Sequence, residues 1–241
     1  MTDARTGLPA GVDGSRWAMP DPRLADPSGV VAVGGDLEVT TLVDAYRRGI
    51  FPWPHSGRAL PWFSPDPRAV LWPEAVRVSR SLRQTLRRAG WLTTVDRAFE
   101  DVIAACADRP WREGTWITRG MRHAYTRLHR LGWAHSVEVW DSGGRLVGGL
   151  YGVRVGACFT GESMFHRLTD ASKVALVDLC RRWAEAGGLL VDVQLPTQHL
   201  ASMGAVETDR ATFLSRLSEA RDVTVCMRAG EFPVSRLARA R

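Results

Sequence analysis

The sequence predicts a mixed α/β fold, in which helices cover one sheet of mixed strand direction and a small N-terminal domain precedes it. Three observations lead to this prediction. Strand-like alternation flanks a turn at residues 142–144, which is typical of a β-hairpin. A third strand-like segment then leads to an apolar helix over 172–186 and a buried strand over 189–193. A stretch rich in Pro, Gly and Ser, residues 56–68, separates these elements from the preceding chain.

The N-terminal domain is expected over residues 1–67, ahead of a larger domain over 68–241. Thr40 or Thr41 is expected to cap its main helix, which ends near Gly49. The Phe-Pro-Trp-Pro run that follows favours an extended turn, because proline restricts the residue before it. The stretch 56–68 is then expected to be a linker or a domain edge.

In the larger domain, apolar spacing and capping residues predict each element in turn. They predict a helix over 79–89, a strand over 91–95, a helix over 96–107, a helix that Thr118 caps and Gly132 ends, hairpin strands containing Val137 and Val139 and then Leu146 to Val153, and a third strand over 157–160. Hairpin strands that feed a strand, helix, strand unit give a mixed sheet covered by helices.

The composition is that of an ordinary globular protein. The chain has 241 residues, of which 45% are hydrophobic and 24% charged. No apolar run approaches the roughly 18 residues that a bilayer span requires, and the N-terminus has no signal-peptide pattern. We therefore expect a cytoplasmic protein with no membrane partner, and nothing in the sequence demands more than a monomer.

Cysteine and histidine spacing gives no sign of a metal site. The four cysteines are Cys106, Cys158, Cys180 and Cys226, which form no Cys-x-x-Cys pair and are expected to be buried free thiols. The six histidines have no metal-ligand spacing. The sequence therefore predicts no metal and no redox motif.

The net charge of +6 comes almost wholly from arginine. Arg80, Arg83 and Arg87 recur at helical spacing, with Arg77 and Arg88 at the margins of the same stripe. Guanidinium groups bind phosphates in bidentate fashion, so this stripe is a candidate contact for a nucleic-acid backbone. A solvated helix face accounts for the pattern equally well.

Polar residues occur within or beside two strand-like segments. Glu162 follows the third strand, Asp192 lies in the last one, and Gln194 directly follows its predicted end. A buried carboxylate without a partner costs on the order of several kcal/mol, so these groups must be paired, solvated in a cleft or engaged with a substrate. Two residues apart on a strand, Asp192 and Gln194 project from one face, which lets Asp192 orient the amide. For an isolated Asp-x-Gln, a helix cap or an arginine pair would be the favoured interpretation.

Seven short strings, taken together, resemble the bacterial leucyl/phenylalanyl-tRNA protein transferase family. They are GGDL at 34–37, YRRGIFPW at 46–53, WFSPDPR at 62–68, GTWIT at 114–118, GESMF at 161–165, ASK at 171–173 and DVQ at 192–194. Each string is modestly specific, but their number and order make a chance similarity improbable. The resemblance covers residues 30 to about 217, and the order of the elements matches the acetyltransferase-like fold.

The resemblance implies an enzyme that takes leucine or phenylalanine, and also methionine, from an aminoacyl-tRNA. It joins that residue to a protein whose N-terminus is Arg or Lys, which marks the protein for the N-end rule pathway. An aminoacyl ester is already activated, so no cofactor is expected. The acceptor amine, with a pKa of about 8, must lose a proton. The family is thought to use the Asp192 and Gln194 pair here, with the tRNA 2′-hydroxyl as the alternative proton carrier.

Further roles are assigned from chemistry and from matching family positions. A carboxylate at Glu162 suits a cationic acceptor residue, with an internal salt bridge to Arg154 or Arg167 as the competitor. A Ser163 and Lys173 nucleophile is disfavoured because no acyl-enzyme is needed. Trp53 and Trp116 match family tryptophans that stack on the terminal base. The expected substrate-binding residues are Trp53, Trp116, Leu150, Phe159, Ser163, Met164, Leu179 and Val191.

Two other function classes compete with this one. An acyl-CoA-dependent N-acetyltransferase would share the sheet, but its pyrophosphate-binding turn is matched only by residues 145–150, within a hairpin strand. A non-catalytic tRNA-binding module would keep the arginine stripe but has no need of Glu162, Asp192 and Gln194 together.

Overall fold

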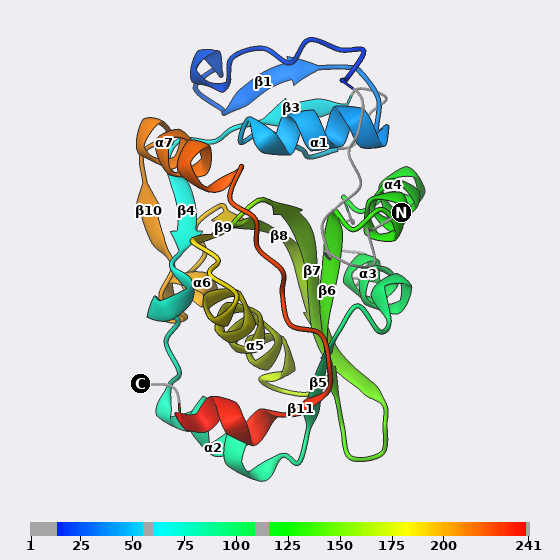
Figure 1. Cartoon of the computed structure of the whole chain (residues 1–241), viewed down its shortest axis with the longest axis vertical. Helices are drawn as coiled ribbons and strands as arrows, with labels where there is room; N and C mark the ends of the chain where they lie inside the picture. Colours follow the sequence, from blue (N-terminus) through cyan, green and yellow to red (C-terminus); the bar gives the residue numbers. More distant parts are fainter. Residues whose placement is uncertain (1–13, 55–59, 109–115, 240–241) are drawn as a thin grey trace.

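The computed structural model describes residues 14–54, 60–108 and 116–239, which contain two β-sheets (Figure 1). The smaller sheet has the strand order β1-β3-β2, and the larger has the order β10-β4-β9-β8-β7-β6-β5-β11. The small sheet and helix α1 lie together at one end of the molecule, at the top of Figure 1.

The N-terminal unit differs from the expectation in two places. Its elements are η1 (Pro22–Leu24), β1 (Val30–Val33), α1 (Val39–Arg47), β2 (Phe51–Pro52) and β3 (Pro61–Phe63). The stretch expected as a linker contains β3, which pairs with both β1 and β2 and buries Trp62; residues 56–59 lie outside the described residues. Thr40 and Thr41 do not cap α1 but lie inside it, and the Asp36 carboxylate accepts hydrogen bonds from the Glu38 backbone N–H and the Thr41 hydroxyl.

The large sheet confirms the predicted mixed α/β class. Its strands are β4 (Arg68–Leu71), β5 (Leu92–Val95), β6 (Ala134–Trp140), β7 (Leu146–Val155), β8 (Cys158–His166), β9 (Leu190–Gln194), β10 (Val206–Thr208) and β11 (Phe232–Pro233). Neighbouring strands are antiparallel except β8 and β9, which are parallel. The expected hairpin is β6-β7, and helix α5 joins β8 to β9 as the strand, helix, strand unit requires. The boundary expected between residues 67 and 68 stays a prediction.

The helices largely follow their sequence signals. They are η2 (Pro73–Ala75), α2 (Arg80–Arg88), α3 (Phe99–Ala107), α4 (Arg119–Arg130), α5 (Ala171–Glu185), α6 (Gln198–Ser202), α7 (Arg210–Ala220) and η3 (Val234–Arg239). The hydroxyls of Ser79 and Thr118 accept hydrogen bonds from the backbone N–H groups of Leu82 and Met121, which confirms the predicted cap at Thr118 and adds a second cap at Ser79. No helix in the described ranges is long and apolar enough to cross a membrane.

Strand β8 is longer than the sequence predicted. The prediction ended it at Thr160, but it continues to His166 because its second half pairs with β7. Gly161 and Met164, expected beyond the strand, face Gly152 and Leu150 in this register. The polar residues of this string are therefore held on a sheet.

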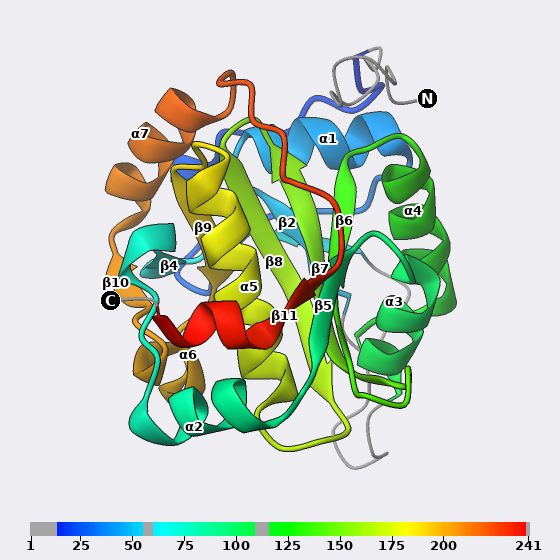
Figure 2. The same ribbon diagram turned by 60° about the horizontal axis from the view of Figure 1, so that its bottom comes forward.

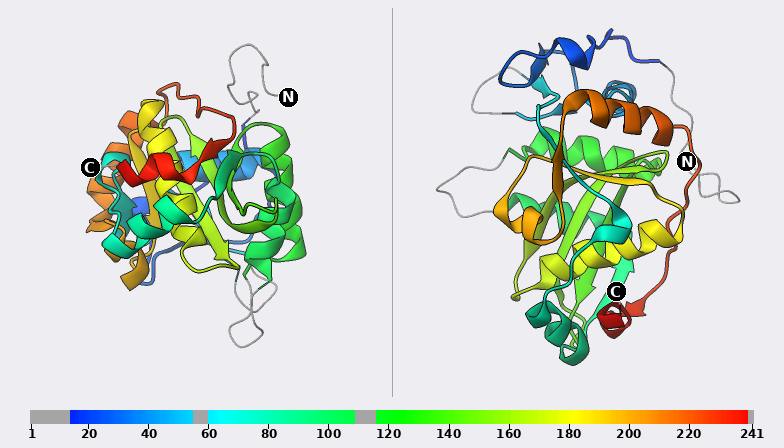
Figure 3. Two further views of the ribbon diagram at one scale, coloured as in Figure 1. Left: turned by 90° about the horizontal axis from the view of Figure 1, so that it is seen from below. Right: turned by 90° about the vertical axis from the view of Figure 1, so that its left-hand side faces the viewer.

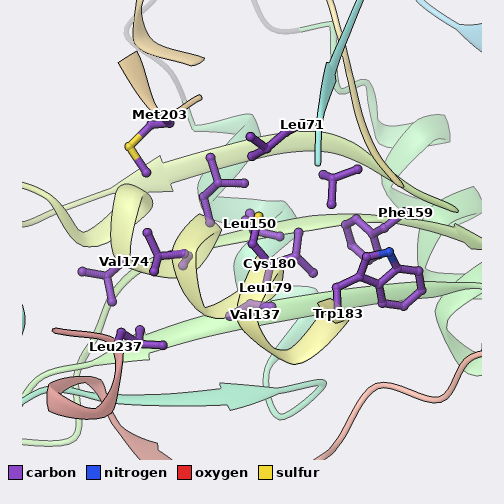
Figure 4. Close-up of a cluster of buried hydrophobic side chains, with 14 of the residues drawn as sticks. Leu71, Val137, Leu150, Phe159, Val174, Leu179, Cys180, Trp183, Met203 and Leu237 are labelled. Carbon is purple, nitrogen blue, oxygen red and sulfur yellow. The ribbon is translucent and has the colours of Figure 1, made fainter. Parts of the chain in front are cut away.

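Helices lie on both faces of the large sheet (Figure 3), and an apolar core lies beneath each layer of helices. Adjacent side chains of β7 point to opposite faces of the sheet: Val147 lies in the core beneath α5, and Leu146 lies in the core beneath α3 and α4. Figure 4 shows the α5 core, where the rings of Phe159 and Trp183 meet edge to face with centroids 5.8 Å apart. Helix α5, which connects β8 to β9, therefore packs on this face of the sheet.

The C-terminal segment belongs to the fold. It runs from α7 across the α5 side of the sheet to β11 and η3 (Figure 2), and it buries Val225 and Met227. Arg182 donates to the Asp178 carboxylate at 2.6 Å and to the backbone carbonyl of Arg228 at 2.7 Å, which fastens the segment to α5. Cys226, predicted to be buried, is exposed because it alternates with these two buried neighbours; the other three cysteines are buried as predicted.

Candidate active site

A pocket lies where strands β8 and β9 separate. The two strands pair through Thr160 and Asp192, and no further pair follows between them in the described residues. Beyond this point β8 stays beside β7, while Gln194 adopts a left-handed conformation with φ of 66° that turns the chain away. The pocket at the divergence has a volume of about 300 Å³.

The pocket wall is mostly apolar and includes the adjacent polar groups of Glu162 and Gln194, which lie 3.0 Å apart. It is formed by Trp116, Leu150, Gly161, Glu162, Ser163, Met164, Leu176, Leu179, Val191, Val193, Gln194, Leu195, Thr197, His199 and Leu200. Its volume is at the lower end of the range for ligand pockets. Met164 supplies a wall that adapts to different shapes. The site therefore suits a small apolar group whose attached polar atoms reach Glu162 and Gln194.

Asp192 forms a buried ion pair behind this pocket. Arg68 on β4 donates from Nε and Nη2 to its two carboxylate oxygens, at 2.8 and 2.6 Å, and both side chains are only 1% exposed. The Arg68 guanidinium lies between the rings of Phe51 and Phe213, at 4.9 and 4.3 Å from their centroids. The carboxylate also accepts the Thr160 hydroxyl at 3.3 Å. Asp192 is thus occupied by protein groups and does not line the pocket.

Gln194 is held by two different carboxylates. Its backbone N–H donates to Asp192 at 3.0 Å, and its side-chain Nε2 donates to Glu162 Oε1 at 3.0 Å. The expectation that Asp192 orients the amide directly is therefore wrong, because the left-handed backbone at Gln194 breaks the strand alternation on which it rested. With Nε2 bound to Glu162, the amide oxygen of Gln194 is left as an acceptor.

Glu162 is buried among hydroxyl groups. Its Oε1 accepts the Tyr46 hydroxyl at 2.8 Å, and its Oε2 lies 3.1 Å from the Tyr125 hydroxyl. The expected competitor, a salt bridge to Arg154 or Arg167, is not formed, since these arginines donate to backbone carbonyls.

Burial dominates the electrostatics of this cluster. It raises the pKa of Glu162 to about 7, and the charge of Asp192 acts in the same direction, while hydrogen bonds from Tyr46, Tyr125 and Gln194 lower that pKa. Burial and the charge of Glu162 raise the pKa of both tyrosines well above the usual value. Both phenols therefore keep their protons, and Glu162 titrates near neutrality.

The structure gathers most, but not all, of the predicted substrate-binding residues. Those on the pocket wall are Trp116, Leu150, Ser163, Met164, Leu179 and Val191. Phe159 lies instead in the α5 core against Trp183, fully buried. Trp53 is half-buried in the N-terminal unit, edge to face with Phe63. Gly114 and Thr115 of the GTWIT string lie outside the described residues.

Sequence reasoning missed three residues that hold the polar groups. Tyr46 and Tyr125 lie among the buried residues of their helices, where a phenol hydroxyl needs a partner. Arg68 directly precedes the apolar run of β4, and an arginine beside a buried strand signals a buried carboxylate. These signals indicate that each side chain needs a polar partner, but they do not identify which residue the partner is.

The predicted arginine stripe lies on α2. Arg80, Arg83 and Arg87 line a shallow depression with Gln84 and Arg88. On the other side of this helix, Thr85 donates at 2.9 Å to Asp170, the residue before α5. The stripe is thus tied to the helix that supplies Leu176 and Leu179 to the pocket.

The remaining side chains near the pocket bear on alternative chemistry. Lys173 forms an ion pair with Asp170 at 2.8 Å. Within residues 14–54, 60–108 and 116–239, no cluster of three His, Cys, Asp or Glu side chains is placed to hold a metal ion.

Comparison with known proteins agrees with the resemblance. The family described as leucyl/phenylalanyl-tRNA protein transferase matches residues 70–218, and its N-terminal domain matches residues 35–66. Among solved structures, a GCN5-related N-acetyltransferase from Kribbella flavida is 10% identical, covers 68% of this chain and 58% of its own, and has a TM-score of 0.39. That score is too low to support an argument.

Relatives with the family's name are much more similar. A leucyl/phenylalanyl-tRNA–protein transferase of Anaeromyxobacter dehalogenans is 55% identical over 205 residues, which is 84% of this chain and 88% of the relative. One from Stutzerimonas stutzeri is 53% identical over 196 residues, with 81% and 86% covered. The chain belongs to the leucyl/phenylalanyl-tRNA protein transferase family.

Proposed function

We propose that this protein transfers leucine or phenylalanine, and also methionine, from an aminoacyl-tRNA to the N-terminal Arg or Lys of an acceptor protein. The new peptide bond would mark the acceptor for the N-end rule pathway. One observation carries the proposal: a small apolar pocket is bordered on one side by Glu162 and the amide of Gln194. Family membership supports aminoacyl transfer, and we further propose that the protein acts in the cytoplasm as a monomer.

The apolar wall is proposed to hold the donor side chain. Leu150, Leu179 and Val191 enclose it, and Met164 adapts to either a branched or a flat group. Binding the side chain here would bring the ester carbonyl of the donor toward Gln194. Trp116 on the same wall is available to stack on the terminal base, a contact worth about 1–3 kcal/mol.

The polar side is proposed to receive the acceptor. The acceptor amine attacks the ester carbonyl, the new C–N bond forms, and the bond to the ribose oxygen breaks. The amine proton finally replaces the acyl group on that oxygen. The amide oxygen of Gln194 would accept a hydrogen bond from the amine, and Glu162 would pair with the cationic acceptor residue. Asp192, which does not line the pocket, would act by fixing the backbone of Gln194.

The arginine stripe is proposed to bind the tRNA backbone. Arg80, Arg83 and Arg87 share one face of α2, with Arg77 just before this helix. Trp53, outside the pocket, is proposed to contact the terminal nucleotide from the N-terminal unit. Because the stripe is joined to α5 through Thr85 and Asp170, bound tRNA and the donor pocket would share one rigid support.

The test supplies purified protein with leucyl-tRNA and a peptide that begins with Arg, and in parallel with acetyl-CoA and the same peptide. We expect leucine transfer from tRNA and no acetylation. Leu179→Trp should fill the pocket and abolish transfer, while Leu189→Trp, at an exposed position outside the pocket, should retain it. Acetylation alone, or tRNA binding without any transfer, would refute the proposal.

A further inference from the structure

The Glu162 carboxyl group and the hydroxyl groups of Tyr46 and Tyr125 form a closed triangle of contacts. Tyr46 reaches it from α1, Tyr125 from α4, and the carboxyl group itself projects from β8. The carboxyl oxygens lie 2.8 Å from the Tyr46 hydroxyl and 3.1 Å from the Tyr125 hydroxyl, and the two hydroxyls are hydrogen-bonded to each other. All three side chains are buried. Each corner of the triangle therefore contacts both others.

The number of protons decides the charge of this triangle. Two oxygens at such distances attract only if a hydrogen lies between them, and each phenol has one hydrogen to donate. An ionised carboxylate adds none, so two hydrogens would serve three contacts and one pair of oxygens would face each other without a proton. A neutral carboxyl group supplies the third hydrogen.

The neutral arrangement satisfies every group. The Tyr125 hydroxyl donates to Oε2 of an ionised carboxylate, but with a proton on Oε2 that contact would reverse: Glu162 Oε2–H would donate to Tyr125, Tyr125 to Tyr46, and Tyr46 to Glu162 Oε1. Oε1 is then the carbonyl oxygen, which also accepts the Nε2 hydrogen of Gln194. The contact to Gln194 thus fixes which carboxyl oxygen carries the proton.

The surrounding charges favour the same state. From β9, Asp192 presents a like charge, and Arg68 on β4 is committed to Asp192. From β7, the Tyr151 ring packs against Tyr125, and from α6, His199 reaches the pocket wall with its pKa lowered by burial and by Lys173. Among the ion pairs of the described residues, none includes Glu162, so an ionised form has no cationic partner.

We propose that Tyr46 and Tyr125 are positioning residues that close a ring of three hydrogen bonds with the protonated Glu162 carboxyl group in the free protein. The neutral group holds the Gln194 amide without placing a net charge in the pocket.

A further consequence rests on the proposed function. A cationic acceptor residue that enters the pocket stabilises the carboxylate, so Glu162 gives its proton to solvent and the ring opens. Binding of a basic N-terminus is then coupled to release of a proton. A pocket with a permanent carboxylate would show no such release.

The first test uses the free protein alone. The carboxyl carbon of Glu162, labelled with carbon-13 and assigned from its loss in Glu162→Gln, is followed by NMR as pH changes. We expect a titration midpoint about 7. A midpoint near the ordinary value of 4.5 would overturn the proposal.

The second test separates a ring from independent hydrogen bonds. Below the midpoint, the buried ring protons should give slowly exchanging downfield signals. Tyr46→Phe or Tyr125→Phe removes one hydroxyl but should abolish the whole set, because the ring is opened. Glu162→Gln has an N–H donor and a carbonyl acceptor in the same places, so its tyrosine signals should persist at high pH. Loss of one signal in each Phe variant with the others unchanged, or loss of both in the Gln variant, would overturn the ring.

A matched control removes the hydroxyl that donates a hydrogen bond to a different buried carboxyl group. Thr94 donates at 2.5 Å to Glu138, whose pKa is also raised by burial. Thr94→Val should move the Glu138 midpoint and leave that of Glu162 in place. A shift of the Glu162 midpoint in this variant would mean that the signal reports general loosening and not the ring.

The acceptor step is tested by calorimetry. An Arg-initiated peptide is titrated at pH 6.5 in two buffers with different ionisation enthalpies, and proton release should be seen with the wild type and not with Glu162→Gln. Binding without release would overturn the coupling. Absence of both binding and transfer would count against the proposed function, whereas the ring in the free protein is judged by the NMR midpoint.

Discussion

Replacement of Arg68 by Met should destabilise the protein more than any exposed charge substitution. Arg68 and Asp192 are each 1% exposed and joined by two short hydrogen bonds, so Arg68→Met leaves a buried carboxylate with only the Thr160 hydroxyl and the Gln194 N–H. Breaking such a pair from one side costs about 3–5 kcal/mol. Replacing both partners by apolar residues is often nearly neutral, but here the Gln194 N–H would lose its acceptor, at about 1–3 kcal/mol.

The assay is urea unfolding followed by circular dichroism, on Arg68→Met, Asp192→Leu and the double variant. We expect the double variant to be more stable than Arg68→Met alone, which gives a coupling energy of several kcal/mol. Arg181→Met, at the exposed pair with Glu185, serves as the control and should change stability by no more than about 0.5 kcal/mol. A loss below about 1 kcal/mol for Arg68→Met, or additive single changes, would refute the reasoning.

The same variants separate stability from positioning. The double variant should regain much of its stability but should not regain transfer, because the backbone of Gln194 has lost its anchor. The tRNA affinity should stay close to that of the wild type. Recovery of transfer together with stability would show that Asp192 serves the fold alone.

Three other outcomes follow from the structure. Glu162→Gln should remove a pH dependence of stability. The folded pKa of Glu162, about 7, lies above the ordinary 4.5, so the stability of the wild type falls as pH rises between these values, and by pH 8 the variant should be more stable than the wild type by up to about 3 kcal/mol in urea unfolding. Equal dependence of stability on pH in the two proteins would argue against burial as the cause. Gly148→Ala places a Cβ 2.5 Å from that of Ala171 and should lose about 1–3 kcal/mol, while Gly161→Ala, with 3.8 Å to its nearest neighbour, should lose little; a reversed order contradicts the packing. Arg83→Ala should weaken tRNA binding and reduce the slope of log K against log salt by about 1, with Arg181→Ala as the control. An unchanged slope would mean that the arginine stripe faces solvent and does not contact tRNA.

Local signals were sufficient where one segment determines its own structure. The cap at Thr118 needs only a hydroxyl and the next turn of helix, and it was predicted correctly. The continuation of β8 past Thr160 was missed because it depends on the partner strand β7. A strand of glycine and polar residues becomes regular only when a neighbour supplies its hydrogen bonds.

The site was predictable as a set of residues but not as an arrangement. Glu162, Asp192 and Gln194 stood out as polar groups in apolar surroundings, and the structure brings all three together. Their partners come from elements far away in the chain: Arg68 lies 124 residues from Asp192, and Tyr46 lies 116 from Glu162. Such pairings depend on the order of the strands in the sheet and on how the helices pack against it. The periodicity of a single segment therefore cannot predict them.

The short strands at the two ends of the large sheet also affect how the protein behaves at high concentration. An uncovered sheet edge is a template for aggregation. At one end β11 has two residues and finishes in Pro233, which has no N–H to offer another strand; at the other, β10 has three and carries Glu207. Loss of the segment after Arg221 would expose the full length of β5, so a shortened chain should self-associate where the whole one stays dispersed.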